Sequence, residues 1–174
     1  MSVSHHFVTN DSADPRLRWK PVAPVTGTVD GAWWPRSLDL VAELRVLSGQ
    51  VATRLRYLAR VAYADQVWEP APRLMKADGH TVRLDGFALQ DPALLYLSGP
   101  DRQRLTLLVI PPTAPARAAD EAMTRAARPG VVPRGADILA AMGIEPGPPV
   151  ARATDDPASD RRESDGGPAG SHAR

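Results

Sequence analysis

The chain has 174 residues with 21 basic and 20 acidic side chains, so its net charge of +1 lacks the bulk positive potential that drives nonspecific binding to nucleic acids or anionic membranes. It contains no cysteine, which excludes disulfides, thiolate nucleophiles and cysteine-ligated metals. The length indicates a single domain, and 18 prolines and 13 glycines predict that part of it is irregular.

Both ends of the chain are predicted to be disordered. Residues 1–15 carry no basic leader and no apolar stretch of signal-peptide length, and residues 144–174 are rich in Pro, Gly, Asp, Ser and Arg with almost no large aliphatic side chain. The longest apolar run, Leu107–Pro112, is far too short to cross a bilayer. We therefore expect a cytoplasmic protein with one domain over residues 16–143 and no membrane partner.

The first predicted elements are two short strands. Arg16–Lys20 alternates basic and apolar side chains with the period of a strand, and the following proline places it at a sheet edge. Val25–Val29 predicts a second strand. The dipeptide Asp30-Gly31 is typical of a turn, so we expect a tight reversal there.

A long helix is predicted next, with Ser37 as its N-cap and Asp39 in its first turn. Apolar residues then recur at three- and four-residue spacing, which places on one helix face Leu40, Leu44, Leu47, Val51, Leu55 and Leu58. The pair Ser48-Gly49 interrupts this stripe and predicts a break or an early end. Alternation over Tyr57–Trp68 indicates a strand after the helix.

Two hairpins are predicted in the second half. Asp78-Gly79 is the dipeptide most typical of a tight hairpin, and it joins the predicted strands Arg73–Ala77 and His80–Asp85. A second hairpin joins Ala93–Ser98 to Arg104–Ile110. The end of this last strand is so uniformly apolar that we expect it to be central and covered on both faces.

Two short helices complete the prediction. The first is capped by Thr113, carries a stripe of alanines and ends at Pro129-Gly130, and the second spans Ala136–Met142 and is closed by Gly143. Together the elements predict an α+β domain: a mostly antiparallel, curved sheet of six or seven strands with one long helix and two C-terminal helices packed on it.

Motifs for several common chemistries are missing from the sequence. No glycine-rich phosphate loop precedes a helix, and His80 is the only histidine inside the predicted domain, so neither a clustered metal site nor a serine triad is expected. We assign no catalytic residue, metal or cofactor. Arg54, Arg56 and Arg60 could follow a phosphate backbone, but no recognised nucleic-acid-binding motif accompanies them, so nucleic acid is not expected as a partner.

The segment Asp30–Ser37, with the sequence DGAWWPRS, predicts a binding site. Its two indoles offer flat apolar walls, the Arg36 guanidinium can grip a carboxylate or phosphate at two points, and Asp30 can orient a donor. A helix N-terminus beside it attracts anions. The expected occupant is a small anionic ligand or a protein partner, and the candidate residues are Asp30, Trp33, Trp34, Arg36, Trp68 and Asp91.

Two other interpretations stay open at this point. Trp33 and Trp34 can simply fill the core, with Asp30 serving its turn and Arg36 pairing with a nearby carboxylate. The leading hypothesis is a non-enzymatic binding or interaction domain, with regulation as one possible role. The alternative is an uncharacterised enzyme that uses carboxylates near the same junction, drawn from Asp30, Asp85 and Asp91.

The segments DGAWWPRS, GFALQDP (86–92) and RLTLLVIPP (104–112), together with the helix after the first of them, resemble a family of actinobacterial proteins classed as a domain of unknown function, DUF5994. The resemblance covers about Arg16 to Arg128. It implies a small intracellular bacterial protein and transfers no activity, cofactor or catalytic residue.

Overall fold

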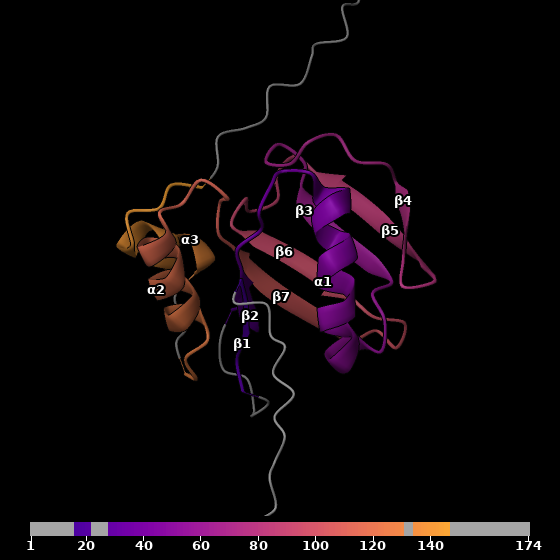
Figure 1. Ribbon diagram of the computed structural model, residues 1–174, viewed down its shortest axis with the longest axis horizontal. Helices are drawn as coiled ribbons and strands as arrows, with labels where there is room; N and C mark the ends of the chain where they lie inside the picture. Colours follow the sequence, from indigo (N-terminus) through magenta and orange to yellow (C-terminus); the bar gives the residue numbers. More distant parts are fainter. Residues whose placement is uncertain (1–15, 22–27, 131–133, 147–174) are drawn as a thin grey trace, which may run out of the picture.

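The computed structural model describes residues 16–21, 28–130 and 134–146 (Figure 1). In this part of the chain the elements follow the order β1 (Leu17–Trp19), β2 (Gly31–Trp33), α1 (Leu40–Leu55), β3 (Arg60–Ala64), β4 (Leu74–Ala77), β5 (His80–Phe87), β6 (Leu94–Ser98), β7 (Arg104–Val109), α2 (Ala116–Ala126) and α3 (Gly135–Ala141). The predicted α+β class is therefore confirmed.

The strands form one seven-stranded sheet in the order β1-β2-β7-β6-β3-β5-β4. The predicted, mostly antiparallel arrangement is wrong, because the sheet is mixed: β2 runs parallel to β7, and β3 runs parallel to β5. In the β4–β5 hairpin, β5 is the strand that pairs with β3, so β4 lies at the edge of the sheet. At the other end, β7 lies between β6 and β2. Alternating side chains indicate where strands lie but not which strands become neighbours.

The predicted tight reversal at Asp30-Gly31 is also wrong, because a strand begins at Gly31. Gly31 begins β2, which pairs with β1 on one side and with β7 on the other. The backbone N–H of Asp30 donates to the Thr106 carbonyl at 2.8 Å, so Asp30 already extends this pairing. Most of the predicted strand Val25–Val29 lies outside the described residues, and Val29 itself is not in a strand.

Helix α1 begins later than the sequence predicts. Its N-cap is Asp39, whose carboxylate accepts the Ala42 N–H at 3.0 Å, whereas the Ser37 hydroxyl donates to the Glu43 carboxylate at 2.9 Å. A side-chain acceptor at the N-cap satisfies an N–H that the helix itself leaves unpaired.

The helix is also continuous through Ser48-Gly49, where a break was predicted. Leu47 and Val51 flank the pair and are almost completely buried. Burying two such side chains contributes about 3–6 kcal/mol, which exceeds the roughly 1 kcal/mol that a helical glycine costs. Tertiary packing therefore outweighs the local helix-breaking tendency.

The hairpin at Asp78-Gly79 is confirmed. Both residues have positive φ, at 47° and 77°, as the tight turn between two antiparallel strands requires. The end of α3 also matches the prediction, because Gly143 follows it with a φ of 67°. Helix α2, in contrast, has Pro115 rather than Thr113 at its N-cap.

Helix α1 covers one face of the sheet, and α2 and α3 cover part of the opposite face (Figure 1). Trp33, Leu107 and Val109 pack in the hydrophobic cluster that contains α1, whereas Ala32 and Leu108 pack with α2 and α3. Consecutive residues of a strand point to opposite faces, so the two clusters lie on opposite sides. Helices α2 and α3 lie at the β1–β2 end, as Figure 1 shows, and leave the other half of their face uncovered by any described helix.

Candidate functional site

Trp33 and Trp68, two of the six predicted site residues, lie together in the core. Their rings stack with centroids 5.6 Å apart and an interplanar angle of 17°. Only 5% of Trp33 and 3% of Trp68 is exposed. Both indoles are therefore core residues that pack between α1 and the sheet.

Trp34 does not share this environment with its neighbour. Its ring packs against the α2–α3 cluster, and its Nε1 donates to the Pro111 carbonyl at 3.1 Å. The guanidinium of Arg16 lies 4.0 Å from the ring centroid, which is a favourable cation–π geometry. The two consecutive indoles therefore belong to different clusters and do not line one pocket.

The remaining predicted residues are spread over three places. The Asp30 carboxylate accepts the Thr106 N–H at 2.7 Å, and the Asp91 carboxylate accepts the Ala93 N–H at 2.9 Å in the turn that leads into β6. Arg36 is exposed just before α1. Four strand positions separate β2 from β5, about 19 Å, so the strand order keeps Asp30 apart from Asp85.

Polar side chains gather on a different surface of the sheet. On the uncovered half of the sheet, alternate residues of four neighbouring strands point away from α1, and we call this surface the open face; it comprises Arg60, Ala62, Arg83, Asp85, Phe87, Tyr96, Ser98, Arg104 and Thr106. The intervening residues, such as Val61 and Leu97, are fully buried beneath α1. The alternation of these strands thus separates a core face from a polar face.

Two arginines of the open face lie on either side of a serine. The strand register pairs Ser98 with Arg104 of β7 and with Arg60 of β3, so the three residues form one row across the sheet. The Cα atoms of the two arginines are separated by two strand spacings, about 10 Å. The short serine side chain leaves room between their guanidinium groups, and we call this row the anion cradle.

The guanidinium of Arg60 is held by Asp85. Its Nε donates to the Asp85 carboxylate at 2.6 Å, and the Nε of Arg83 donates to the other carboxylate oxygen at 2.9 Å. Among the described residues, no hydrogen-bond partner is found for the terminal nitrogens of Arg60 or for the Arg104 guanidinium. Both arginines of the cradle can therefore donate two parallel hydrogen bonds to an oxyanion.

Asp85 stays ionised in this arrangement. Burial by itself would raise the pKa of its carboxyl, but hydrogen bonds from Arg83 and Arg60 and the charges of these two arginines lower the pKa below its usual value. The side chain is 17% exposed, which preserves much of the attraction. The carboxylate therefore orients Arg60 at neutral pH.

A hollow of about 370 Å³ opens beside the cradle. Besides the three cradle residues it is lined by Ala62, Phe87, Gln90 and Tyr96. The Gln90 amide nitrogen donates to the Ala62 and Leu94 carbonyls at 3.1 and 3.0 Å, which fixes the amide and leaves its oxygen as an acceptor. Cations, an acceptor and two aromatic rings thus border one small space, whose volume is within the range of small-molecule sites.

On the other side of the cradle lies a second hollow of about 470 Å³. It shares the three cradle residues and is completed by Gly99, Pro100 and Arg102 of the turn between β6 and β7. Arg102 adds a further guanidinium to this end of the row. The cradle is therefore the boundary between two openings.

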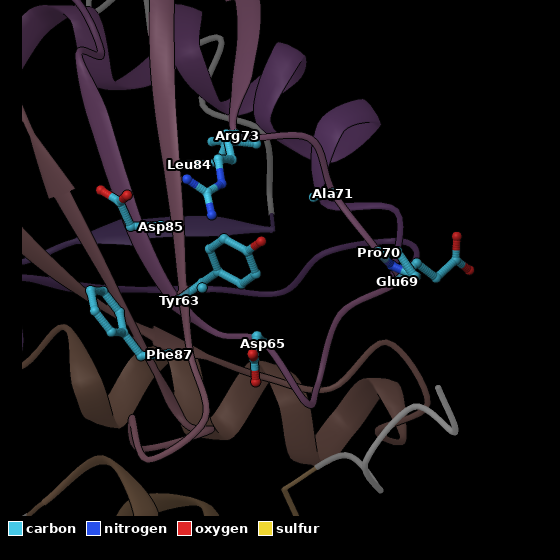
Figure 2. A pocket seen from close by; sticks show the side chains of 10 residues that line it. Tyr63, Asp65, Glu69, Pro70, Ala71, Arg73, Leu84, Asp85 and Phe87 are labelled. Carbon is cyan, nitrogen blue, oxygen red and sulfur yellow. The ribbon is translucent and has the colours of Figure 1, made fainter. Parts of the chain in front are cut away.

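Figure 2 shows a third hollow, of about 460 Å³, beside the carboxyl ends of β3 and β5. Arg73 points toward the ring of Tyr63, and the Glu69 carboxylate points away from it. β4 pairs only with the first half of β5, so the edge of β5 near Gly86 borders this hollow instead of a strand. Its lining has carboxylates from Asp65, Glu69 and Asp85 and one guanidinium from Arg73, so its charge is negative, opposite to that of the cradle.

Sequence reasoning missed Arg104, Ser98 and Tyr96 as site residues and considered Arg60 only among the arginines that could follow a phosphate backbone. The signal that could have found them is the alternation of polar with buried residues along β3 and β6. That signal identifies an exposed face, but the row across the strands requires the register, which no single segment contains.

The fold and the open face define an α+β domain with a basic, partly aromatic sheet surface. Residues 16–126, more than half of the chain, match the family of unknown function DUF5994, and the chain belongs to this family. No curated protein and no solved structure matches it. In the described ranges no helix is long and apolar enough to cross a membrane.

Proposed function

We propose that this protein is a non-enzymatic binding domain and that the anion cradle holds a small organic anion. The observation that supports the proposal is the pair of guanidinium groups of Arg60 and Arg104, on either side of Ser98, whose terminal nitrogens have no partner among the described residues. Charge-assisted hydrogen bonds from two arginines are well suited to a phosphate or a carboxylate.

The local charge supports the same ligand class. The open face carries three arginines, Arg60, Arg83 and Arg104, but only one carboxylate, Asp85, which pairs with the first two, so this surface is positive although the whole chain is almost neutral. Like charges gathered on a sheet repel one another, and an anion bound between them relieves this repulsion. The anionic ligand that the sequence predicts is thus retained, while its proposed position moves from the Trp33–Arg36 segment to the open face.

Isothermal titration calorimetry with inorganic phosphate and ribose 5-phosphate tests the proposal. We expect the Arg104→Ala variant to weaken the binding of either probe at least tenfold, because one charge-assisted hydrogen bond is worth about 1.5–3 kcal/mol. Arg45→Ala is the matched control, since Arg45 is an exposed arginine of α1 outside the cradle.

The wild-type affinity should also fall with increasing salt, because the contacts are charged. An Arg104→Ala variant that binds as tightly as the wild type, or a wild type that binds neither probe at millimolar concentration, refutes the cradle as an anion site.

A further inference from the structure

Tyr96 is the next open-face residue along β6 from the anion cradle. It lies two residues before Ser98 on the same face, about 7 Å away along the strand. Its cross-strand neighbours are Ala62 and Thr106, whose side chains are small, and 38% of the tyrosine is exposed. The ring is therefore accessible to a flat ligand group.

Two further groups border the space above this ring. Phe87 is 47% exposed at the side of the same hollow, and the fixed Gln90 amide has only its oxygen left to accept a hydrogen bond. An aromatic surface favours a planar ring, and an amide oxygen favours a ring that carries an N–H group.

We infer that the ligand is a nucleotide whose phosphate lies in the anion cradle and whose base stacks on Tyr96, an inference that rests on the proposed function. In one nucleotide the phosphate and the base are joined through a single ribose, and the short separation of Ser98 and Tyr96 allows both ends to be bound at once. Stacking on an exposed aromatic ring is a common way for sheet surfaces to hold bases.

The size and charge of the site agree with this ligand class. A volume of about 370 Å³ accommodates a base and its sugar. Beyond the cradle, Arg102 borders the second hollow, which has room for another phosphate. This second phosphate can belong to a free nucleotide or to the next residue of a short single strand, and both present the same chemistry.

The test compares AMP, GMP, CMP and UMP with ribose 5-phosphate and with a single-stranded hexaribonucleotide, by calorimetry at fixed salt. We expect at least one of the four nucleotides to bind about tenfold more tightly than ribose 5-phosphate. Tyr96→Ala should abolish this difference. Tyr96→Phe should preserve the difference, since it keeps the ring, and thermal melting confirms that both variants are folded.

The outcomes separate the two proposals. If ribose 5-phosphate binds as tightly as all four nucleotides, or if Tyr96→Ala leaves the difference intact, the stacking inference is overturned while the anion cradle stands. If no phosphate compound binds, the proposed function itself fails. A hexanucleotide that binds more tightly than every mononucleotide, in a Tyr96-dependent way, identifies a single strand as the source of the ligand, and equal affinities identify the free nucleotide.

Discussion

Replacement of Asp85 by asparagine should remove the group that orients Arg60. The carboxylate bonds the Nε atoms of both Arg60 and Arg83, at 2.6 and 2.9 Å. The two arginine side chains are 49% and 66% exposed, so each pair contributes only about 0.5 kcal/mol after screening by solvent. Asp85→Asn should therefore lower the free energy of unfolding by about 1 kcal/mol at pH 7.

The pH dependence of this loss follows from the lowered pKa of Asp85. In the unfolded chain an aspartate titrates near pH 4, so the stabilising contribution is complete above about pH 4–5 and is lost as the pH falls through the lower pKa of the folded state. Urea denaturation of the wild type and of Asp85→Asn at pH 7 and at lower pH measures the difference.

The two proteins should differ at pH 7 and become equally stable at acid pH. Asp101→Asn is the matched control, because its single pair with Arg56 is exposed on both sides and should contribute less. Binding of ribose 5-phosphate at pH 7 should also weaken in Asp85→Asn, since Arg60 loses its orientation. A stability difference that persists unchanged at acid pH, or a control that loses as much as Asp85→Asn, refutes the reasoning.

Two further predictions test the packing. Trp68→Ala should lower the free energy of unfolding by about 3–5 kcal/mol, because it removes a buried ring stacked on Trp33. Urea denaturation should detect this loss, while the affinity for ribose 5-phosphate stays the same. A Trp68→Ala variant as stable as the wild type would contradict the packing role. Gly86→Ala should destabilise by about 1–3 kcal/mol because its Cβ would lie 2.8 Å from the Asp65 Cβ, whereas Gly49→Ala, with nothing within 4 Å, should stabilise α1 by about 0.5–1 kcal/mol. Equal thermal shifts for the two glycine variants would show that the close approach at Gly86 is not restrictive.

Local chemistry explains the parts of the fold that could be predicted. The Asp78-Gly79 hairpin follows from a turn in which both residues need positive φ, and α1 follows from its apolar stripe. The apolar end of β7 is buried on both faces, as its composition predicts. The errors at Asp30-Gly31 and Ser48-Gly49 share one cause, because in both places long-range pairing or burial overrides the local preference of a glycine.

The candidate site also depends on contacts between residues that are far apart in the sequence. Sequence reasoning grouped Trp33 and Trp34 because they are adjacent in the chain. Consecutive residues of an extended segment point to opposite faces of a sheet, so the two rings pack in different hydrophobic clusters. Arg60 and Arg104, in contrast, are distant in the chain, and β6 brings them into one row through Ser98. Two residues that are neighbours in the sequence thus lie in separate clusters, while two arginines that are far apart in the sequence lie in one site.

The sequence by itself determined the class of the domain, the second-half hairpins, the apolar face of α1 and the buried character of β7, since each depends on side-chain periodicity within a few residues. Only the tertiary structure decided the mixed strand order and the position of the anion cradle. The order in which strands join a sheet, and the register between them, are set by the packing of the whole chain, so no local pattern carries the information that brings Arg60, Ser98 and Arg104 together.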